Sequence, residues 1–106
     1  MFELIFHPDA YHEIHQLDKS MKAKALSALD KLESRGNDLR YPDTDIIQDG
    51  LFELRAGKKD ISRTFFAFAQ GRRIYILRTF IKKKPRTPQA EIAIALKRLD
   101  EVIDES

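Results

Sequence analysis

The chain lacks cysteine, internal repeats and any glycine- or serine-rich stretch. Without cysteine, disulfides, thiol catalysis and cysteine-based zinc sites are excluded. No apolar run approaches the roughly 20 residues that a membrane span needs. The first residues also lack the basic and apolar regions of a signal peptide. We therefore expect a cytoplasmic protein that makes no contact with a membrane.

The composition is that of an ordinary globular protein. Apolar residues make up 42% of the 106 residues and aromatic residues 9%. A chain of this length has room for one modest hydrophobic core. We expect a single domain over residues 1–106.

Charge is distributed unevenly along the chain. Residues 1–54 carry six Lys and Arg against 11 Asp and Glu, whereas residues 55–98 carry 13 against two, a net charge of +11. Residues 99–106 carry four acids and no base. A segment that basic attracts polyanions, chiefly nucleic acid. The alternative is a solvated cationic face without a partner.

The first half predicts one strand followed by two helices. Residues Phe2–Phe6 form the strand, and Pro8 suits the first turn of a helix. Ser20 is the expected cap of a second helix, which Gly36 ends. The apolar positions at helical spacing are Tyr11, Ile14 and Leu17, then Met21, Ala25, Ala28, Leu29 and Leu32.

The second half predicts a loop, three strands and a helix. Residues 37–50 are rich in Asn, Asp, Pro and Gly, which favours a loop. Short connections then join three strands into an antiparallel meander: Leu51–Ala56, Ile61–Ala69 and Arg73–Ile81. The last helix opens at Thr87-Pro88, with an apolar stripe of Ile92, Ala95, Leu96, Leu99, Val102 and Ile103. The predicted class is α+β, in the order β-α-α-β-β-β-α, with helices packed on an antiparallel sheet.

The hairpin at Gln70-Gly71 determines which side chains face one another. A two-residue loop there places Arg63 directly opposite Arg78, on the same sheet face as Lys82. Arg55 joins this face if the preceding loop has an odd number of residues. The same register assigns Phe65, Ile76 and Phe80 to the arginine face, and assigns Phe66, Phe68, Tyr75 and Leu77 to the face that holds the helices.

Two arginines directly opposed on a sheet repel each other, so their placement suggests an anion between them. The alternatives are that each arginine has its own acid, such as Glu53, or that the register differs. The run Lys82–Arg86 precedes a helix N-terminus, where phosphate can bind. By itself this run is equally compatible with a solvated loop.

Several motifs of the second half resemble the phage-related HigB branch of the RelE/ParE toxin superfamily. They are GLFELR at 50–55, Arg63-x-x-Phe66, ILRTFIKK at 76–83, Thr87-Pro88 and Glu91-Ile92-Ala93-x-Ala95. The resemblance covers roughly residues 1–100. It implies a RelE-like fold and the toxin of a toxin–antitoxin pair, usually an endoribonuclease that cuts mRNA in the ribosomal A site. It also implies a cognate antitoxin, commonly of the helix-turn-helix type, and no cofactor.

The resemblance assigns catalytic roles to Arg55, Arg63, Lys82 and Lys83. Arginine clamps phosphate but does not give up its proton, so the two arginines stabilise charge. Lys82 or Lys83 would act as the base if neighbouring cations favoured the neutral amine. We expect further contacts to RNA phosphates from Arg78, Lys84, Arg86, Lys58 and Arg73.

The chain departs from the better-known ribonucleases of the superfamily, which often add a tyrosine or histidine near the C-terminus. None follows Tyr75. Either a lysine transfers the proton, the ribosome contributes, or the chain is not a ribonuclease. The ParE branch inhibits DNA gyrase with the same fold, and a toxin-like fold retained only to bind nucleic acid is a third reading.

We expect Arg63 to lie on the exposed face of the sheet. The substitution Arg63→Ala should therefore abolish growth inhibition and leave the fold intact.

Two clusters suggest metal binding only weakly. His12 and His15 lie three apart but have no third ligand at useful spacing. The acids Asp43, Asp45 and Asp49 lack the glycine and closing glutamate of a calcium loop. We expect no metal site.

Overall fold

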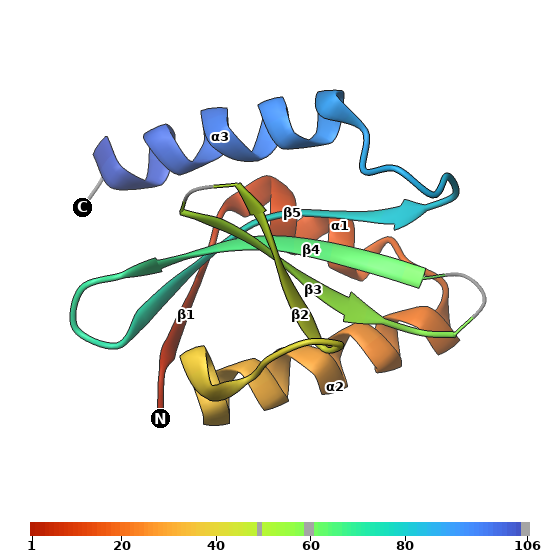
Figure 1. The fold of residues 1–106 in the computed structure, drawn as a ribbon, viewed down its shortest axis with the longest axis horizontal. Helices are drawn as coiled ribbons and strands as arrows, with labels where there is room; N and C mark the ends of the chain where they lie inside the picture. The colour runs from red at the N-terminus through yellow and green to blue at the C-terminus, as the bar shows by residue number, and fades with distance from the viewer. Residues whose placement is uncertain (49, 59–60, 105–106) are drawn as a thin grey trace.

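The computed structural model describes residues 1–48, 50–58 and 61–104, which form three helices, a short 3-10 turn and a five-stranded sheet (Figure 1). The sheet order is β1-β5-β4-β3-β2; β1 pairs in parallel with β5, and the other pairs are antiparallel. None of the helices in these ranges is long and apolar enough to span a membrane. The elements are β1 (Glu3–Phe6), α1 (Pro8–His15), α2 (Lys19–Arg35), η1 (Gly36–Asp38), β2 (Thr44–Gln48), β3 (Leu51–Ala56), β4 (Ile61–Ala69), β5 (Arg73–Lys82) and α3 (Gln89–Asp104).

The α+β class and the meander of β3, β4 and β5 are confirmed. The sheet is mixed rather than antiparallel, because β1 runs parallel to β5. The expectation of a loop throughout 37–50 was wrong for its second part, where β2 adds an edge strand to β3. Thr44 pairs with Leu54 there, and its hydroxyl donates to the Leu39 carbonyl at 2.8 Å. Asp49 lies outside the described residues.

Two helix starts differ from those expected. Asp18, not Ser20, caps α2, because its carboxylate accepts a hydrogen bond from the Met21 amide at 2.9 Å. Helix α3 begins at Gln89, one residue later than expected, since the Pro88 carbonyl accepts the first helical hydrogen bonds. The starts at Pro8 for α1 and the end of α2 at Gly36 are confirmed.

The hairpin between β4 and β5 has a different register from the expected one. Ala69 pairs with Arg73, so the loop contains three residues, with Gly71 and Arg72 at positive φ. Further along, the register shifts at a β-bulge, where Leu77 is the extra residue. The predicted opposition of Arg63 and Arg78 was therefore wrong.

The new register pairs Arg63 with Phe80 and Arg78 with Phe65. All four side chains remain on one face, as expected, together with Lys82. Upstream of the bulge the alternation is reversed relative to the prediction. Ile76 packs on the α1–α2 side, whereas Tyr75 and Leu77 pack beneath α3.

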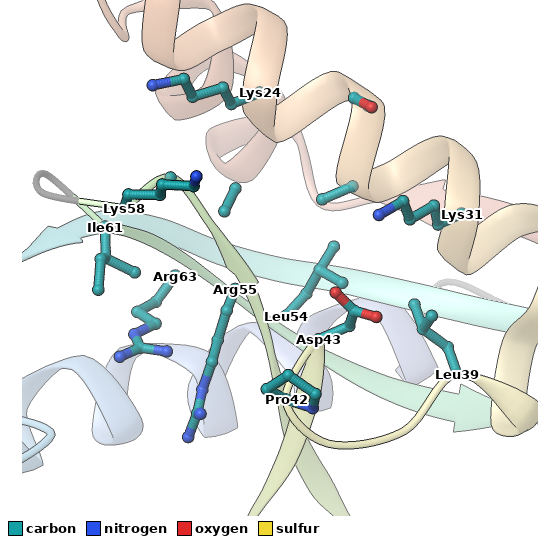
Figure 2. A pocket seen from close by; sticks show the side chains of 14 residues that line it. Lys24, Lys31, Leu39, Pro42, Asp43, Leu54, Arg55, Lys58, Ile61 and Arg63 are labelled. Carbon is teal, nitrogen blue, oxygen red and sulfur yellow. The ribbon is translucent and has the colours of Figure 1, made fainter.

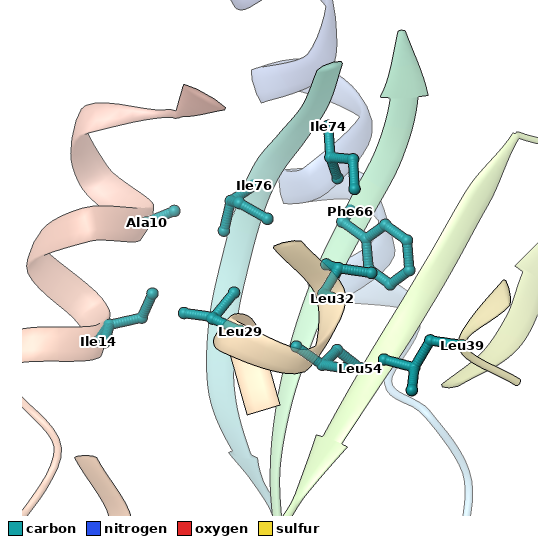
Figure 3. Close-up of a cluster of buried hydrophobic side chains, with 9 residues drawn as sticks. All are labelled: Ala10, Ile14, Leu29, Leu32, Leu39, Leu54, Phe66, Ile74 and Ile76. Atoms are coloured by element: carbon teal, nitrogen blue, oxygen red, sulfur yellow. The ribbon is translucent and has the colours of Figure 1, made fainter. Parts of the chain in front are cut away.

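Helices cover both faces of the sheet, not one. Helix α3 lies over the face that carries Phe65, Leu77 and Phe80, and α2 lies under the opposite face (Figure 1). The core between α1, α2 and the sheet is shown in Figure 3, where Leu32 lies beside Phe66 and Ile14 points toward Leu29. The arginine face is therefore partly a second core, which changes the setting of every basic residue on it.

Gly36 allows a close approach to the ring of Phe2. Its φ is +53°, and a Cβ there would overlap the Phe2 ring. We expect Gly36→Ala to lower the free energy of unfolding by about 2 kcal/mol or more, from backbone strain and overlap together. Gly71→Ala is the matched control, because Gly71 also has a positive φ, +72°, but ample space. Urea unfolding measures both, and equal losses would contradict the contact with Phe2.

Candidate functional site

Two arginines from neighbouring strands lie side by side on the α3 face. Arg55, near the end of β3, pairs directly with Arg63 on β4. The loop between these strands therefore has an odd number of residues, which was the condition for Arg55 to lie on the same face as Arg63. One carboxylate oxygen of Glu53 accepts from Nε of Arg55 at 2.9 Å and from Nη1 of Arg63 at 3.3 Å. Asp45 of β2 accepts from Nη2 of Arg55 at 3.0 Å. We call these four residues the arginine cluster.

The two arginines differ in their surroundings. Burial lowers the pKa of Arg63, an effect that the charge of Arg55 adds to and that of Glu53 opposes. Burial also acts to lower the pKa of Arg55, but hydrogen bonds with Glu53 and Tyr41 and the charges of Glu53 and Asp45 outweigh it, so that pKa is raised. Arg55 is also the more accessible of the two, with 26% of its side chain exposed against 8% for Arg63.

In this cluster the arginines are paired with acids of the protein, which is the alternative to an anion bound between them. Arg63 is only 7% exposed and Glu53 only 2%. The premise that Arg63 lies on a non-core face was wrong, because α3 packs on that face. In the described part of the chain, Oε1 of Glu53 and Nε of Arg63 are buried without a hydrogen-bond partner. The cluster therefore retains one buried acceptor and one buried donor.

Lys82 extends this face toward the end of the sheet. It pairs with Ile61, which makes it the diagonal neighbour of Arg63. Beyond it, the segment that leads to α3 curves around a hollow of about 630 Å³. Lys82, Lys83, Lys84 and Arg86 line this hollow, and none of them has an ion pair with a described residue. The structure thus brings three predicted catalytic residues, Arg55, Arg63 and Lys82, onto one face, next to the basic segment that contains Lys83.

Arg78 lies on the same face but is fully engaged. Its guanidinium contacts Glu13 of α1, and it donates to Glu91 of α3 at 2.9 Å. These contacts fasten both helices to the middle of β5. Arg78 is therefore a structural residue in this structure, and its predicted role in phosphate binding would require it to leave two carboxylates.

Glu13 also binds the edge of β5 where β1 no longer pairs with it. It accepts from the Thr79 amide at 3.0 Å and from Arg98 at 2.9 Å. Burial acts to raise the pKa of Glu13, but hydrogen bonds from Arg98 and Thr79 and the charge of Arg78 outweigh it, so the pKa is lowered. A single carboxylate thus joins α1, β5 and α3.

Of two further predicted phosphate ligands, Arg73 lies elsewhere and Lys58 lies near the arginine pair. Arg73 is at the opposite end of β5 from Lys82 and donates to the Gln70 carbonyl at 2.9 Å. Lys58 borders a groove of about 680 Å³ between α2 and β3, opposite Lys24 and Lys31 (Figure 2). The guanidinium groups of Arg55 and Arg63 point away from α2 in this view. Both arginines nevertheless line this groove, so the groove adjoins the arginine cluster.

Sequence reasoning missed three members of the neighbourhood. Glu53 was considered only as an alternative partner, although its spacing of two from Arg55 on a strand places both on one face. Asp45 was assigned to a loop. Tyr41 had no signal at all, yet its ring centroid lies 5.1 Å from the guanidinium carbon of Arg55. Among the described residues, no group of three or more His, Asp and Glu side chains is arranged to hold a metal.

The order and packing of these elements define a RelE-like α+β fold, with helices on both faces of the sheet. The family model described as "Phage derived protein Gp49-like (DUF891)" matches residues 12–100. The chain therefore belongs to this family of phage-derived, RelE/toxin-like proteins. No curated protein matches it.

Removing the shared carboxylate should destabilise the protein. We expect Glu53→Gln to lower the free energy of unfolding by about 3 kcal/mol, because Arg63 would remain buried without its anionic partner. Asp30→Asn on the exposed face of α2 is the control and should change stability by less than about 0.5 kcal/mol. Chemical unfolding compares the two. A Glu53→Gln variant as stable as the control would show that the ion pair does not stabilise the fold.

Glu13 should make stability depend on pH. The pKa of Glu13 is lower in the folded state than its ordinary value of 4.5. The stability that Glu13 contributes is therefore fully present above pH 4.5, and it is lost as the pH falls through the pKa of the folded state. We expect the stability difference between wild type and Glu13→Gln to be largest near neutral pH and to shrink on acidification below about pH 4. Thermal melts across this range measure it. A difference that does not vary with pH would contradict the assignment.

Proposed function

We propose that this protein is the HigB-type toxin of a toxin–antitoxin pair, and that it cleaves mRNA on the ribosome and so blocks translation. The observation that carries this proposal is the pair Arg55 and Arg63, held side by side by Glu53 next to Lys82. Membership in a toxin-like family supports it. The unpaired cations of the segment 82–86 supply the attraction to RNA that the neutralised arginine pair does not.

The proposed reaction is an internal transfer at one phosphodiester. The ribose 2′-oxygen attacks phosphorus, the bond from phosphorus to the 5′-oxygen breaks, and a 2′,3′-cyclic phosphate forms. Lys82 or Lys83, in its neutral amine form, accepts the 2′-hydroxyl proton, and the resulting ammonium group returns a proton to the departing 5′-oxygen. Arg55, whose pKa is raised, stabilises the charge that develops on the phosphate oxygens. Arg63 is the second, more deeply buried member of this charge-stabilising pair.

The proposal includes two partners. The ribosome presents the mRNA, and a cognate antitoxin, expected to be of the helix-turn-helix type, keeps the toxin inactive. Both follow from the resemblance to HigB-type toxins. Co-expression with the neighbouring reading frame would test the second partner.

The experiment uses purified ribosomes loaded with mRNA, with 5′ ends mapped after addition of the protein. We expect Arg55→Ala to slow cleavage by about 100-fold or more, because one charge-stabilising group is lost. Lys97→Ala, on the exposed surface of α3, is the matched control and should cleave like wild type. Melting curves confirm that each variant folds.

Two outcomes would overturn the proposal. One is intact mRNA with the wild-type protein. The other is double-strand DNA breaks in cells whose transcripts are uncut, which would indicate gyrase as the target.

A further inference from the structure

A second hollow lies at the β2 edge of the sheet, bordered by the segment that leads from α2 to β2. Its volume is about 520 Å³, and three phenylalanines are among its lining residues: Phe52, Phe66 and Phe68. Phe52 is stacked on Phe66, with ring planes 20° apart. Polar side chains of Asn37, Arg40 and Asp45 form part of the rim. The hollow therefore combines flat aromatic surfaces with hydrogen-bonding groups.

Two large side chains beside this hollow are unusually exposed. Tyr41 is 71% exposed and Ile46 is 67% exposed, and both line the hollow. A single exposed apolar residue is ordinary, but two at one aromatic hollow mark a binding surface. Tyr41 is also oriented, because its ring lies against the guanidinium of Arg55.

The hollow adjoins the arginine cluster. Asp45 belongs to the cluster, since it pairs with Arg55 at 3.0 Å, and it also lines the hollow; Tyr41 lines the hollow and lies against Arg55. A ligand with a flat ring in the hollow would carry its attached groups toward Arg55. A nucleotide has this form, with a flat base at one end and an anionic phosphate at the other.

We propose that this hollow binds one unstacked nucleobase of a single-stranded RNA whose phosphate lies at Arg55. The inference rests on the proposed function, because it names the part of the substrate next to the bond that is cut. Single-stranded RNA is recognised by stacking of splayed bases on aromatic rings and by hydrogen bonds to base edges. Tyr41 is the stacking platform, and Asn37 and Asp45 offer a donor and acceptors to the base edge.

The groove between α2 and β3 is the weaker candidate for a nucleobase. Its lining combines cationic side chains, Arg55 and Arg63 among them, with aliphatic ones such as Leu54, and it contains no aromatic ring. The guanidinium groups of the two arginines point away from α2 (Figure 2). Stacking therefore favours the hollow beside Tyr41.

The test measures binding of a fluorescein-labelled RNA pentanucleotide with 2′-O-methyl groups, which cannot be cleaved because it lacks the attacking hydroxyl. A second probe is identical but has one abasic position. We expect the wild-type chain to bind the best-placed abasic probe about tenfold more weakly than the intact one. Tyr41→Ala should remove this difference between probes, and Tyr41→Phe should retain it because the ring remains.

Tyr11→Ala is the matched control, because Tyr11 is another exposed tyrosine, at 50%, but lies on α1, and this variant should behave like wild type. Equal binding of both probes by the wild-type chain at every abasic position would overturn the base site, and so would a Tyr41→Ala variant that still distinguishes them. In either case cleavage of ribosome-bound mRNA by the wild-type protein would leave the proposed function standing. Conversely, base-dependent binding without cleavage would support the base site and reject the nuclease.

Discussion

The arrangement of the candidate site depends on one carboxylate oxygen of Glu53. Two guanidinium groups on adjacent strands repel each other, and the shared oxygen offsets that repulsion in a setting where almost no water reaches either Glu53 or Arg63. Because the acid is buried, its interactions are screened little by salt. The site therefore has a fixed floor formed by Glu53 and Arg63, and an adjustable rim formed by Arg55, which is 26% exposed.

The unequal charge of the two halves of the sequence is partly balanced in three dimensions. Ion pairs join bases of the second half to acids of the first half, as in Arg63 with Glu53, Arg78 with Glu13 and Arg98 with Asp9. The charge asymmetry thus indicates which segments pack together as much as it indicates a polyanionic partner. Within the described part of the chain, the excess that remains is concentrated where β5 leads into α3, at residues 82–86.

Part of the site was predictable and part was not. The residue types and the membership of Arg55, Arg63 and Lys82 in one face follow from the period of two along a strand. The pairing of Arg55 with Glu53 was also predictable, because residues two apart on a strand share a face. Tyr41 and Asp45 were not, since they come from a segment with loop composition that becomes part of a sheet edge only by pairing with β3.

The sequence by itself determined the helices, four of the five strands and the α+β class, because apolar spacing, capping residues and short connections act over a few neighbouring residues. Only the tertiary structure decided which face each side chain occupies and what covers it. The physical reason is two changes of one residue each: the three-residue hairpin loop exchanges the faces of the first part of β5, and the extra residue at Leu77 exchanges them again, and no local signal marks either change. Placement of α3 over the arginines likewise depends on contacts between distant segments, such as Arg78 with Glu91.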